Sequence, residues 1–145
     1  YTMNRDRISG NEAIEAIKTV KQFTSNGQFQ AMREGLRGDE SQHFQDKLME
    51  YGERINTMPK TYEQDGKGDQ AVAYLHYFTG GCDWYITEKD SEPVQLQAFG
   101  YANLGDDQNA ELGYISIVEL LENGAELDLY FKPRTLAEIK QRKAA

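Results

Sequence analysis

The feature that most constrains the fold is a change in the spacing of apolar residues about halfway along the chain. In the first half, Phe44, Leu48, Tyr51 and Ile55 recur at i, i+4, i+7 and i+11, which is the spacing of one face of a helix. In residues 72–79 the period changes to two, which is the spacing of the two faces of a strand. One face would carry Val72, Tyr74, His76 and Phe78, and the other Ala73, Leu75, Tyr77 and Thr79. The sequence therefore predicts helices first and a sheet second.

Three segments in the first sixty residues have helical spacing. The first follows the capping-box sequence at residues 9–12 and ends at the stop signal Ser25-Asn26-Gly27. The second is expected over residues 29–36. The third is expected from about residue 39 to Asn56, where Met58-Pro59 ends it.

The second half of the chain is expected to build four or five strands. Gly80-Gly81 supplies a tight turn, so the first two strands form a hairpin. The expected strands cover residues 72–79, 83–88, 95–102, 112–115 and 126–131. Two further capping boxes, Ser116 with Glu119 and Thr135 with Glu138, predict a helix before the last strand and another at the C-terminus.

Short links between strands favour antiparallel pairing, so the predicted class is α+β. We expect N-terminal helices, then a mainly antiparallel sheet of four or five strands with one inserted helix, and a C-terminal helix. Residues 1–60 are expected to be a helical subdomain that packs on the sheet, and residues 61–145 the sheet domain, together forming one globular unit.

The chain shows no sign of a membrane or an oxidising compartment. Its apolar runs are shorter than the ~20 residues that span a bilayer. The single cysteine, Cys82, cannot form an internal disulfide. We therefore expect a soluble, cytoplasmic protein, with Met3 as its natural start and Tyr1-Thr2 as an addition.

The net charge of −8 is concentrated in one part of the chain. Residues 83–128 hold eleven acids and one base, Lys89. Such a segment attracts cations and repels nucleic-acid phosphate. We expect an acidic face that docks a protein partner, a basic nucleic-acid-binding protein being the natural candidate. The alternative is a solvated surface that only maintains solubility. The acids expected to make contact are Glu88, Asp90, Asp106, Asp107, Glu111, Glu119, Glu122 and Glu126.

Aromatic residues are dense in the predicted sheet, where ten fall between residues 74 and 131. If helices cover one face of the sheet, alternation leaves several tyrosines on the other face, a composition typical of protein interfaces. The tyrosines expected there are Tyr77, Tyr85, Tyr101 and Tyr114. Stacking on single-stranded bases is the rival use, but it requires basic residues that this segment almost lacks.

No pattern predicts a cofactor, a metal site or a reactive thiol. Cys82 lies beside Asp83, whose charge opposes thiolate formation. Metal-ligand spacing and phosphate-binding glycine motifs are absent from the sequence. Glu88 and Asp90 lie about 7 Å apart on one side of a strand, which with His76 leaves a carboxylate-based hydrolase as an alternative.

A basic C-terminal segment supplies another alternative, a nucleic-acid-binding accessory factor for plasmid or phage maintenance. Residues 132–143 hold five bases against one acid. The bases expected to contact phosphate are Lys132, Arg134, Lys140, Arg142 and Lys143, with Arg33 and Arg37.

Part of the second half resembles a known family. The strings are ELGYIS at residues 111–116, VEL at 118–120 and LDLYFKP-x-TL at 127–136, with WYITE at 84–88 further upstream. Together they are similar to uncharacterised small proteins encoded on plasmids, integrative elements and phages, over about residues 72–139. The resemblance implies a setting among accessory genes and no transferable activity. The leading hypothesis is a non-enzymatic accessory protein of a mobile element that binds a protein, as an inhibitor of restriction or CRISPR-type defence acting as a nucleic-acid mimic would.

Overall fold

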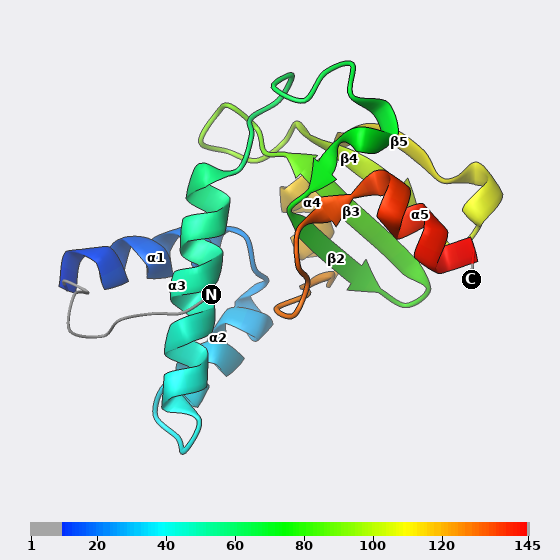
Figure 1. Ribbon diagram of the computed structural model, residues 1–145. Helices are drawn as coiled ribbons and strands as arrows, with labels where there is room; N and C mark the ends of the chain where they lie inside the picture. Colours follow the sequence, from blue (N-terminus) through cyan, green and yellow to red (C-terminus); the bar gives the residue numbers. More distant parts are fainter. Residues whose placement is uncertain (1–9, 145) are drawn as a thin grey trace. The chain divides into compact units, whose positions relative to one another are not determined.

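The computed structural model describes residues 10–144, so the residues before Gly10, including Ser9 of the first capping box, lie outside the described part. The chain divides into two compact units, Tyr1–Thr57 and Met58–Ala145, close to the expected boundary at residue 60. The predicted α+β class is confirmed: residues 10–144 contain five α-helices, a five-stranded antiparallel sheet and a two-stranded one (Figure 1).

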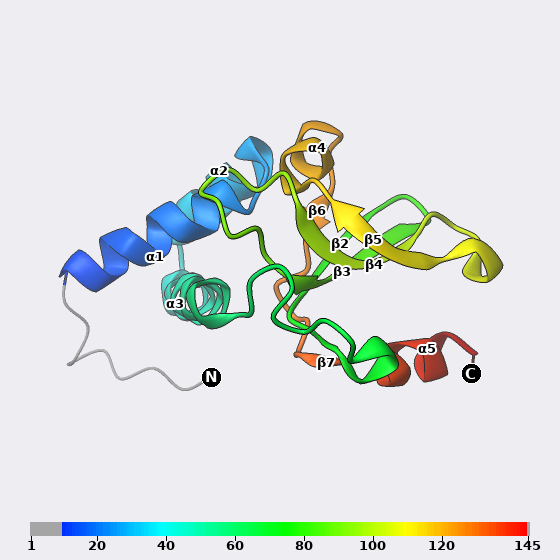
Figure 2. The same cartoon turned by 90° about the horizontal axis from the view of Figure 1, so that it is seen from above.

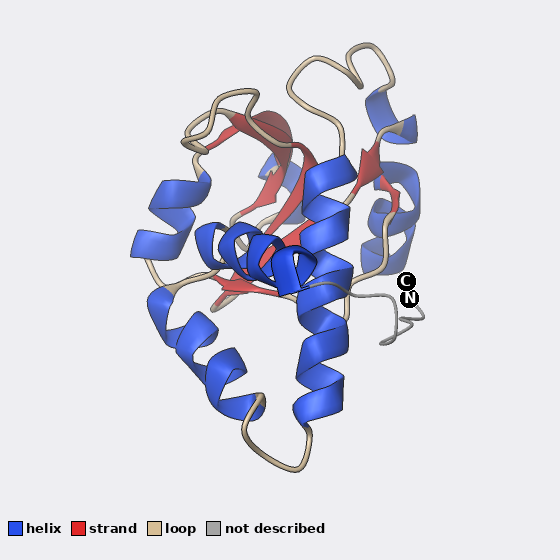
Figure 3. Ribbon diagram, turned by 90° about the vertical axis from the view of Figure 1, so that its left-hand side faces the viewer, coloured by secondary structure: helices blue, strands red, loops and turns tan. Residues whose placement is uncertain are grey.

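Three helices make up the described part of the first unit: α1 (Gly10–Gln22), α2 (Asn26–Gly35) and α3 (Ser41–Thr57). Figure 3 shows them in blue. α1 and α3 approach closely where Gly52 lies against Ala16. A Cβ atom at position 52 would stand only 2.9 Å from the Ala16 Cβ, so the glycine allows this approach. The apolar faces predicted from the spacing therefore pack against each other.

The second helix begins three residues earlier than the spacing predicts. Ser25 adopts an extended backbone, and its side chain accepts a hydrogen bond from the N–H of Gln28. The serine that was expected only to end the first helix is thus the N-cap of the next one.

The main sheet of the second unit has the strand order β5-β4-β3-β2-β6, and every neighbouring pair is antiparallel. The strands are β2 (Leu75–Thr79), β3 (Cys82–Glu88), β4 (Ala98–Asn103), β5 (Glu111–Ile115) and β6 (Glu126–Leu127). Gly80, with φ of 55°, closes the predicted β2–β3 hairpin. Cys82 pairs with Thr79 beside this turn.

Two helices cover opposite faces of the sheet, α4 (Ile117–Glu122) on one side and α5 (Leu136–Ala144) on the other (Figure 2). Both predicted N-caps form, and the Thr135 box is completed by the Glu138 carboxylate, which accepts the N–H of Thr135. The Ser116 hydroxyl accepts from the N–H of Glu119, and the Thr135 hydroxyl accepts from the N–H of Glu138.

Three predicted strands are shorter than expected, and one of them, the 95–102 segment, pairs only from Ala98 onward as β4. The 72–79 segment breaks at Tyr74, so that β1 (Val72–Ala73) leaves the main sheet and pairs with β7 (Arg134–Thr135). The 126–131 segment pairs only over β6, because Asp128 turns the chain: its carboxylate accepts from the N–H of Tyr130.

A β-bulge interrupts the pairing of β3 with β4. Ile86 lies opposite Gly100, but Glu88 lies opposite Phe99, so Thr87 is the extra residue. A bulge changes which face the following side chains point to. Glu88 therefore shares a face of the sheet with Phe99, the face that α5 covers in part.

The close approach of β3 and β4 gives a stability prediction. A methyl group at position 100 would overlap the carbonyl oxygen of Tyr85, so we expect Gly100→Ala to lower the free energy of unfolding by about 3 kcal/mol or more. Its cross-strand partner Gly113 has open space around it, and Gly113→Ala should be neutral or stabilising by about 0.5–1 kcal/mol. Urea unfolding of the two variants checks this, and equal losses would contradict it.

Candidate functional site

Three of the four tyrosines expected at an interface are buried, so that prediction is wrong for Tyr77, Tyr85 and Tyr101. Tyr85 and Tyr101 pack with Leu136 and Ile139 under α5. The reason is that helices cover both faces of the sheet rather than one. Burial accordingly raises the pKa of Tyr77, and burial followed by the charges of nearby aspartates raises that of Tyr85 to about 12.

Two of the eight acids expected to contact a partner are also buried. Glu88 is 3% exposed and Asp90 is 8% exposed, so neither belongs to an exposed acidic face. The carboxylate of Asp90 accepts N–H groups of Glu92, Leu96 and Gln97 at 2.9–3.2 Å. Burial alone would raise the pKa of Asp90, but these backbone donors outweigh it and leave the pKa below its usual range.

The six remaining acids do not gather on one face. They are Asp106, Asp107 and Glu111 near the start of β5, and Glu119, Glu122 and Glu126 on α4 and β6. β5 and β6 are opposite edges of the sheet, about 19 Å apart at the usual strand spacing. Moreover, Asp106 and Asp107 accept hydrogen bonds within their own turn. The prediction of a single acidic face built from all eight is therefore wrong.

His76 lies between two aspartates and not beside Glu88 and Asp90. Its Nδ1 is 2.9 Å from Asp128 and its Nε2 is 2.7 Å from Asp83, while its ring stacks on Tyr85. A neutral imidazole carries one N–H, so both hydrogen bonds can form only if the set of His76, Asp83 and Asp128 holds one additional proton. The contacts of His76, Glu88 and Asp90 thus do not assemble the hydrolase arrangement.

Bases of the C-terminal segment make contacts inside the second unit. Lys140 forms an ion pair with Asp69 at 2.6 Å and lies over the ring of Tyr101. Arg134 lies over the ring of Phe131. Arg33 and Arg37 belong to the first unit, and the side chain of Lys143 lies outside the described part. Two of the bases expected to contact phosphate, Arg134 and Lys140, are thus engaged with side chains of their own unit.

The structure reveals a site that the sequence did not predict, in the segment that follows α3. Residues 59–61 run parallel to the end of β3: the N–H of Thr61 donates to the carbonyl of Lys89 at 2.8 Å, and the N–H of Lys89 donates to the carbonyl of Pro59 at 2.9 Å. The segment is therefore held along the sheet rather than free of it.

Glu88 fixes the next turn of this segment. One carboxylate oxygen accepts the N–H of Tyr62 at 2.8 Å, and the other accepts the N–H of Gln64 at 2.7 Å. The buried side chain of Gln64 in turn bonds the backbone of Val72 and Thr87, each at 2.8 Å. The contacts of Glu88 with Tyr62 and Gln64, and of Gln64 with Thr87, join residues 23–26 positions apart, so sequence spacing gave no signal for them.

Tyr62 has an unusual backbone. Its φ is 78°, the only positive φ of a non-glycine residue within 10–144. This conformation is costly for a tyrosine and persists where surrounding contacts impose it. It leaves the side chain 68% exposed, with its hydroxyl bonded to that of Tyr114. The Tyr114 ring meets Phe99 edge-on at 5.7 Å, so three aromatic side chains are contiguous.

These residues border a pocket of about 290 Å³, which we call the Tyr62 pocket. It is lined by Tyr62, Gln64, Asp65, Gly66, Gly68, Ala71, Thr87, Glu88, Phe99 and Leu112. The lining includes two acids and no base. The hydrogen bond with the Tyr62 hydroxyl, followed by desolvation and by the negative charges of Glu88 and Asp65, raises the pKa of Tyr114. The volume is small for a cofactor and fits a single side chain of a partner.

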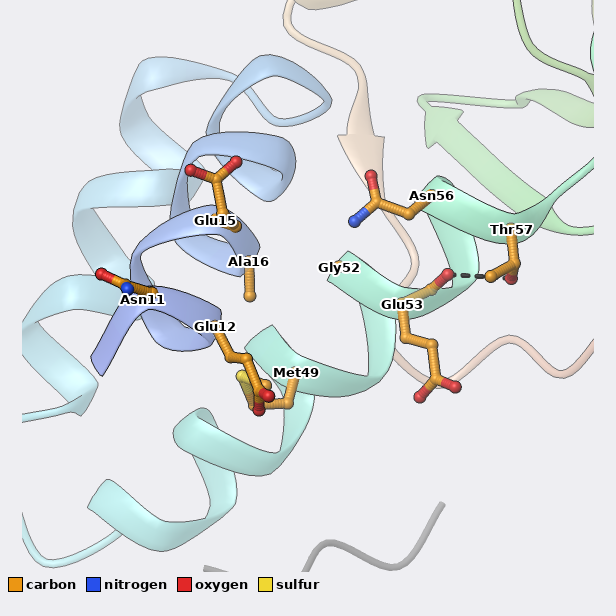
Figure 4. Close-up of a pocket in the computed structure, with 9 residues that line it drawn as sticks. All are labelled: Asn11, Glu12, Glu15, Ala16, Met49, Gly52, Glu53, Asn56 and Thr57. Carbon is orange, nitrogen blue, oxygen red and sulfur yellow. Dashed lines mark hydrogen bonds between the residues drawn. The ribbon is translucent and has the colours of Figure 1, made fainter. Parts of the chain in front are cut away.

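A larger pocket of about 510 Å³ lies between α1 and α3 (Figure 4). Ala16 and Gly52 form its floor, and the side chains of Glu15 and Glu53 point away from it. Its glutamates are exposed, so it lacks the buried charge that distinguishes the Tyr62 pocket. We therefore take the Tyr62 pocket as the candidate functional site.

Comparison with known proteins adds no assignment: no protein-family model, no curated protein and no solved structure matches the chain. Within residues 10–144, no helix is long and apolar enough to cross a membrane. In the same part of the chain, no three His, Cys, Asp or Glu side chains converge as metal ligands would. The interpretation of the site therefore depends on its own geometry.

The buried Asp90 carboxylate predicts a pH dependence. Because its pKa is lower in the folded chain, it stabilises the fold above the unfolded pKa of 3.8, and this contribution is lost as the pH falls through the folded value. At pH 7 we expect Asp90→Asn to lower the free energy of unfolding by about 1–3 kcal/mol, since an amide leaves backbone donors unpaired. The loss should shrink as the pH is lowered from about 5 to about 2.

Chemical denaturation across this pH range measures the effect. The exposed Glu92 two residues away gives the control, and Glu92→Gln should change the unfolding free energy by less than about 0.5 kcal/mol. A loss in Asp90→Asn that does not vary with pH would contradict the carboxylate's role.

Proposed function

We propose that the chain is a non-enzymatic accessory protein that binds a protein partner through the surface around the Tyr62 pocket. We call the exposed apolar part of this surface, formed by Tyr62, Leu112 and Tyr114, the Tyr62 surface. The observation that carries the proposal is the strained backbone of Tyr62, which contacts from buried Glu88 hold in place while the ring stays in solvent. Strain of this kind concentrates at binding sites.

Exposure supports the proposal. Leu112 and Tyr114 are 41% and 56% exposed and project from one strand, next to the exposed ring of Tyr62. Scattered apolar side chains on a surface need no explanation, but adjoining ones on rigid elements are typical of docking sites. Aromatic anchors beside a pocket are the usual centre of such interfaces.

The position of β5 also supports protein binding. β5 is an edge strand of five residues, whereas the other edge, β6, has only two. Its sequence, Glu-Leu-Gly-Tyr-Ile, contains no lysine or proline, the residues that commonly block pairing at an edge. An extended partner segment can therefore add to this edge while its side chains reach the Tyr62 surface.

The charge of the site favours a basic protein as the partner, because the pocket lining is acidic and repels phosphate. The mobile-element setting comes from the resemblance in residues 72–139 and is part of the proposal on that ground alone. Mimicry of nucleic acid by an eight-residue acidic face is not part of it, since two of those acids are buried.

Affinity capture with paired variants tests the function. We expect the wild-type chain to retain a host protein at low salt and Leu112→Asp to lose most of that binding, because the change places a charge in the Tyr62 surface. Leu104→Asp is the matched control: Leu104 is 68% exposed and lies in the turn after β4, so this variant should bind like the wild type. Circular dichroism confirms that both variants fold. Equal retention by Leu112→Asp and the wild type would refute the proposed docking surface.

A further inference from the structure

Glu88 carries a buried charge without a counter-charge. It is 3% exposed, and its two oxygens accept one backbone N–H each. None of the ion pairs among residues 10–144 involves it. A buried carboxylate is costly unless a cation or several donors compensate it. Two neutral donors provide part of that compensation, and a carboxylate has further lone pairs to offer.

The unpaired charge lies at a pocket with aromatic walls. Tyr62 and Phe99 both line the pocket that Glu88 lines. Tyr114 holds these two rings, through the hydroxyl contact on one side and the edge-on contact on the other. The face of an aromatic ring attracts a cation, most strongly where water is excluded. The aromatic rings and the carboxylate of Glu88 thus both favour a cationic ligand.

The surrounding charge has the same sign. Asp65, exposed in the turn after Tyr62, is the second acid of the lining, and the lining holds no lysine, arginine or histidine. The hydrogen bond with Tyr62 is the main cause of the raised pKa of Tyr114, and the charges of Glu88 and Asp65 raise it further. The pocket therefore has a negative field and no resident cation among its lining residues.

An organic cation fits these features better than a metal ion does. Two acids are too few for Ca²⁺, which takes six to eight oxygen ligands. A guanidinium group is planar and weakly hydrated, stacks on aromatic rings and makes paired hydrogen bonds to a carboxylate. A lysine ammonium is compact and strongly hydrated, so it gains less from such walls.

We propose that the Tyr62 pocket receives one arginine side chain of the partner, with its guanidinium group at the rings of Tyr62 and Phe99 and directed toward Glu88. This inference rests on the proposed function, because the arginine belongs to the segment that docks on the Tyr62 surface. It specifies the partner as a basic segment with an arginine at the docking position.

Titration of the full chain with short capped peptides tests the inference. Three peptides share one sequence and differ at the central residue, which is arginine, lysine or citrulline. Citrulline has nearly the shape of arginine and no charge. In nitrogen–proton correlation spectra we expect the arginine peptide to shift the amides of Tyr62, Gln64 and Leu112 in a saturable way. The citrulline peptide should bind at least about tenfold more weakly than the arginine peptide, because it lacks the charge-assisted bonds.

Variants separate the pocket from general charge attraction. Phe99→Leu keeps an apolar side chain and removes a ring, so it should weaken arginine binding about tenfold, within the range of a desolvated cation–ring contact. Leu104→Ala changes an exposed apolar side chain in the turn after β4, outside the pocket lining, and should bind within about threefold of the wild type. Glu88→Gln is less informative, because it also removes a carboxylate oxygen that accepts a backbone N–H of the turn. Asp65→Asn removes one negative charge of the pocket lining and leaves those hydrogen bonds in place.

The outcomes are distinct. Equal binding of the arginine and citrulline peptides, equal binding of arginine and lysine, or shifts outside the pocket would each overturn the assignment. No binding of the arginine peptide at millimolar concentration would overturn it too. If that happens while capture of a host protein still depends on Leu112, the inference fails and the docking surface stands. If capture is also independent of Leu112, both fail.

Discussion

The carboxylate of Glu88 is the interaction on which the candidate site depends. The bulge at Thr87 reverses the alternation of β3 and places Glu88 on the same face as Phe99, where its carboxylate accepts the N–H groups of Tyr62 and Gln64. Leaving one buried donor without an acceptor costs about 1–3 kcal/mol, comparable with the cost of an unfavourable backbone conformation. A single buried group can thus maintain the positive φ of Tyr62 and the exposed ring that follows from it.

Hydrogen bonds from neutral donors also satisfy other carboxylates of the acidic segment, residues 83–128. Among the eleven acids of residues 83–128, six have partners within the fold: Asp83, Glu88, Asp90, Asp106, Asp107 and Asp128. Their partners include backbone N–H groups, the side-chain amides of Asn103 and Asn109, and the imidazole of His76. A charge imbalance in the sequence is therefore not by itself a sign of an acidic face, since neutral donors can satisfy carboxylates. The number of acids in this segment therefore matters less than the position of Glu88, the one of them that lines the Tyr62 pocket.

Much of the fold could be predicted because its signals are local. The change of period separates helices from strands, Gly80-Gly81 closes a hairpin, and the boxes at Ser116 and Thr135 begin the last two helices. Each signal depends on residues within a few positions of one another. The candidate site was missed for the opposite reason: Glu88 lies 26 residues from Tyr62, and Tyr114 lies 52 residues from it.

Sequence alone determined the class, the order of helices and strands, the antiparallel pairing and the sign of the charge, because these follow from period, caps and composition. It assigned side chains to alternate faces of each strand but could not say which face meets solvent, since that depends on what packs there. Tertiary structure decided that α4 and α5 cover opposite faces of the sheet, that α5 buries Tyr85 and Tyr101, and that one bulge places Glu88 on the face of Phe99. A pocket requires surfaces from distant segments to meet, and only the folded chain brings them together.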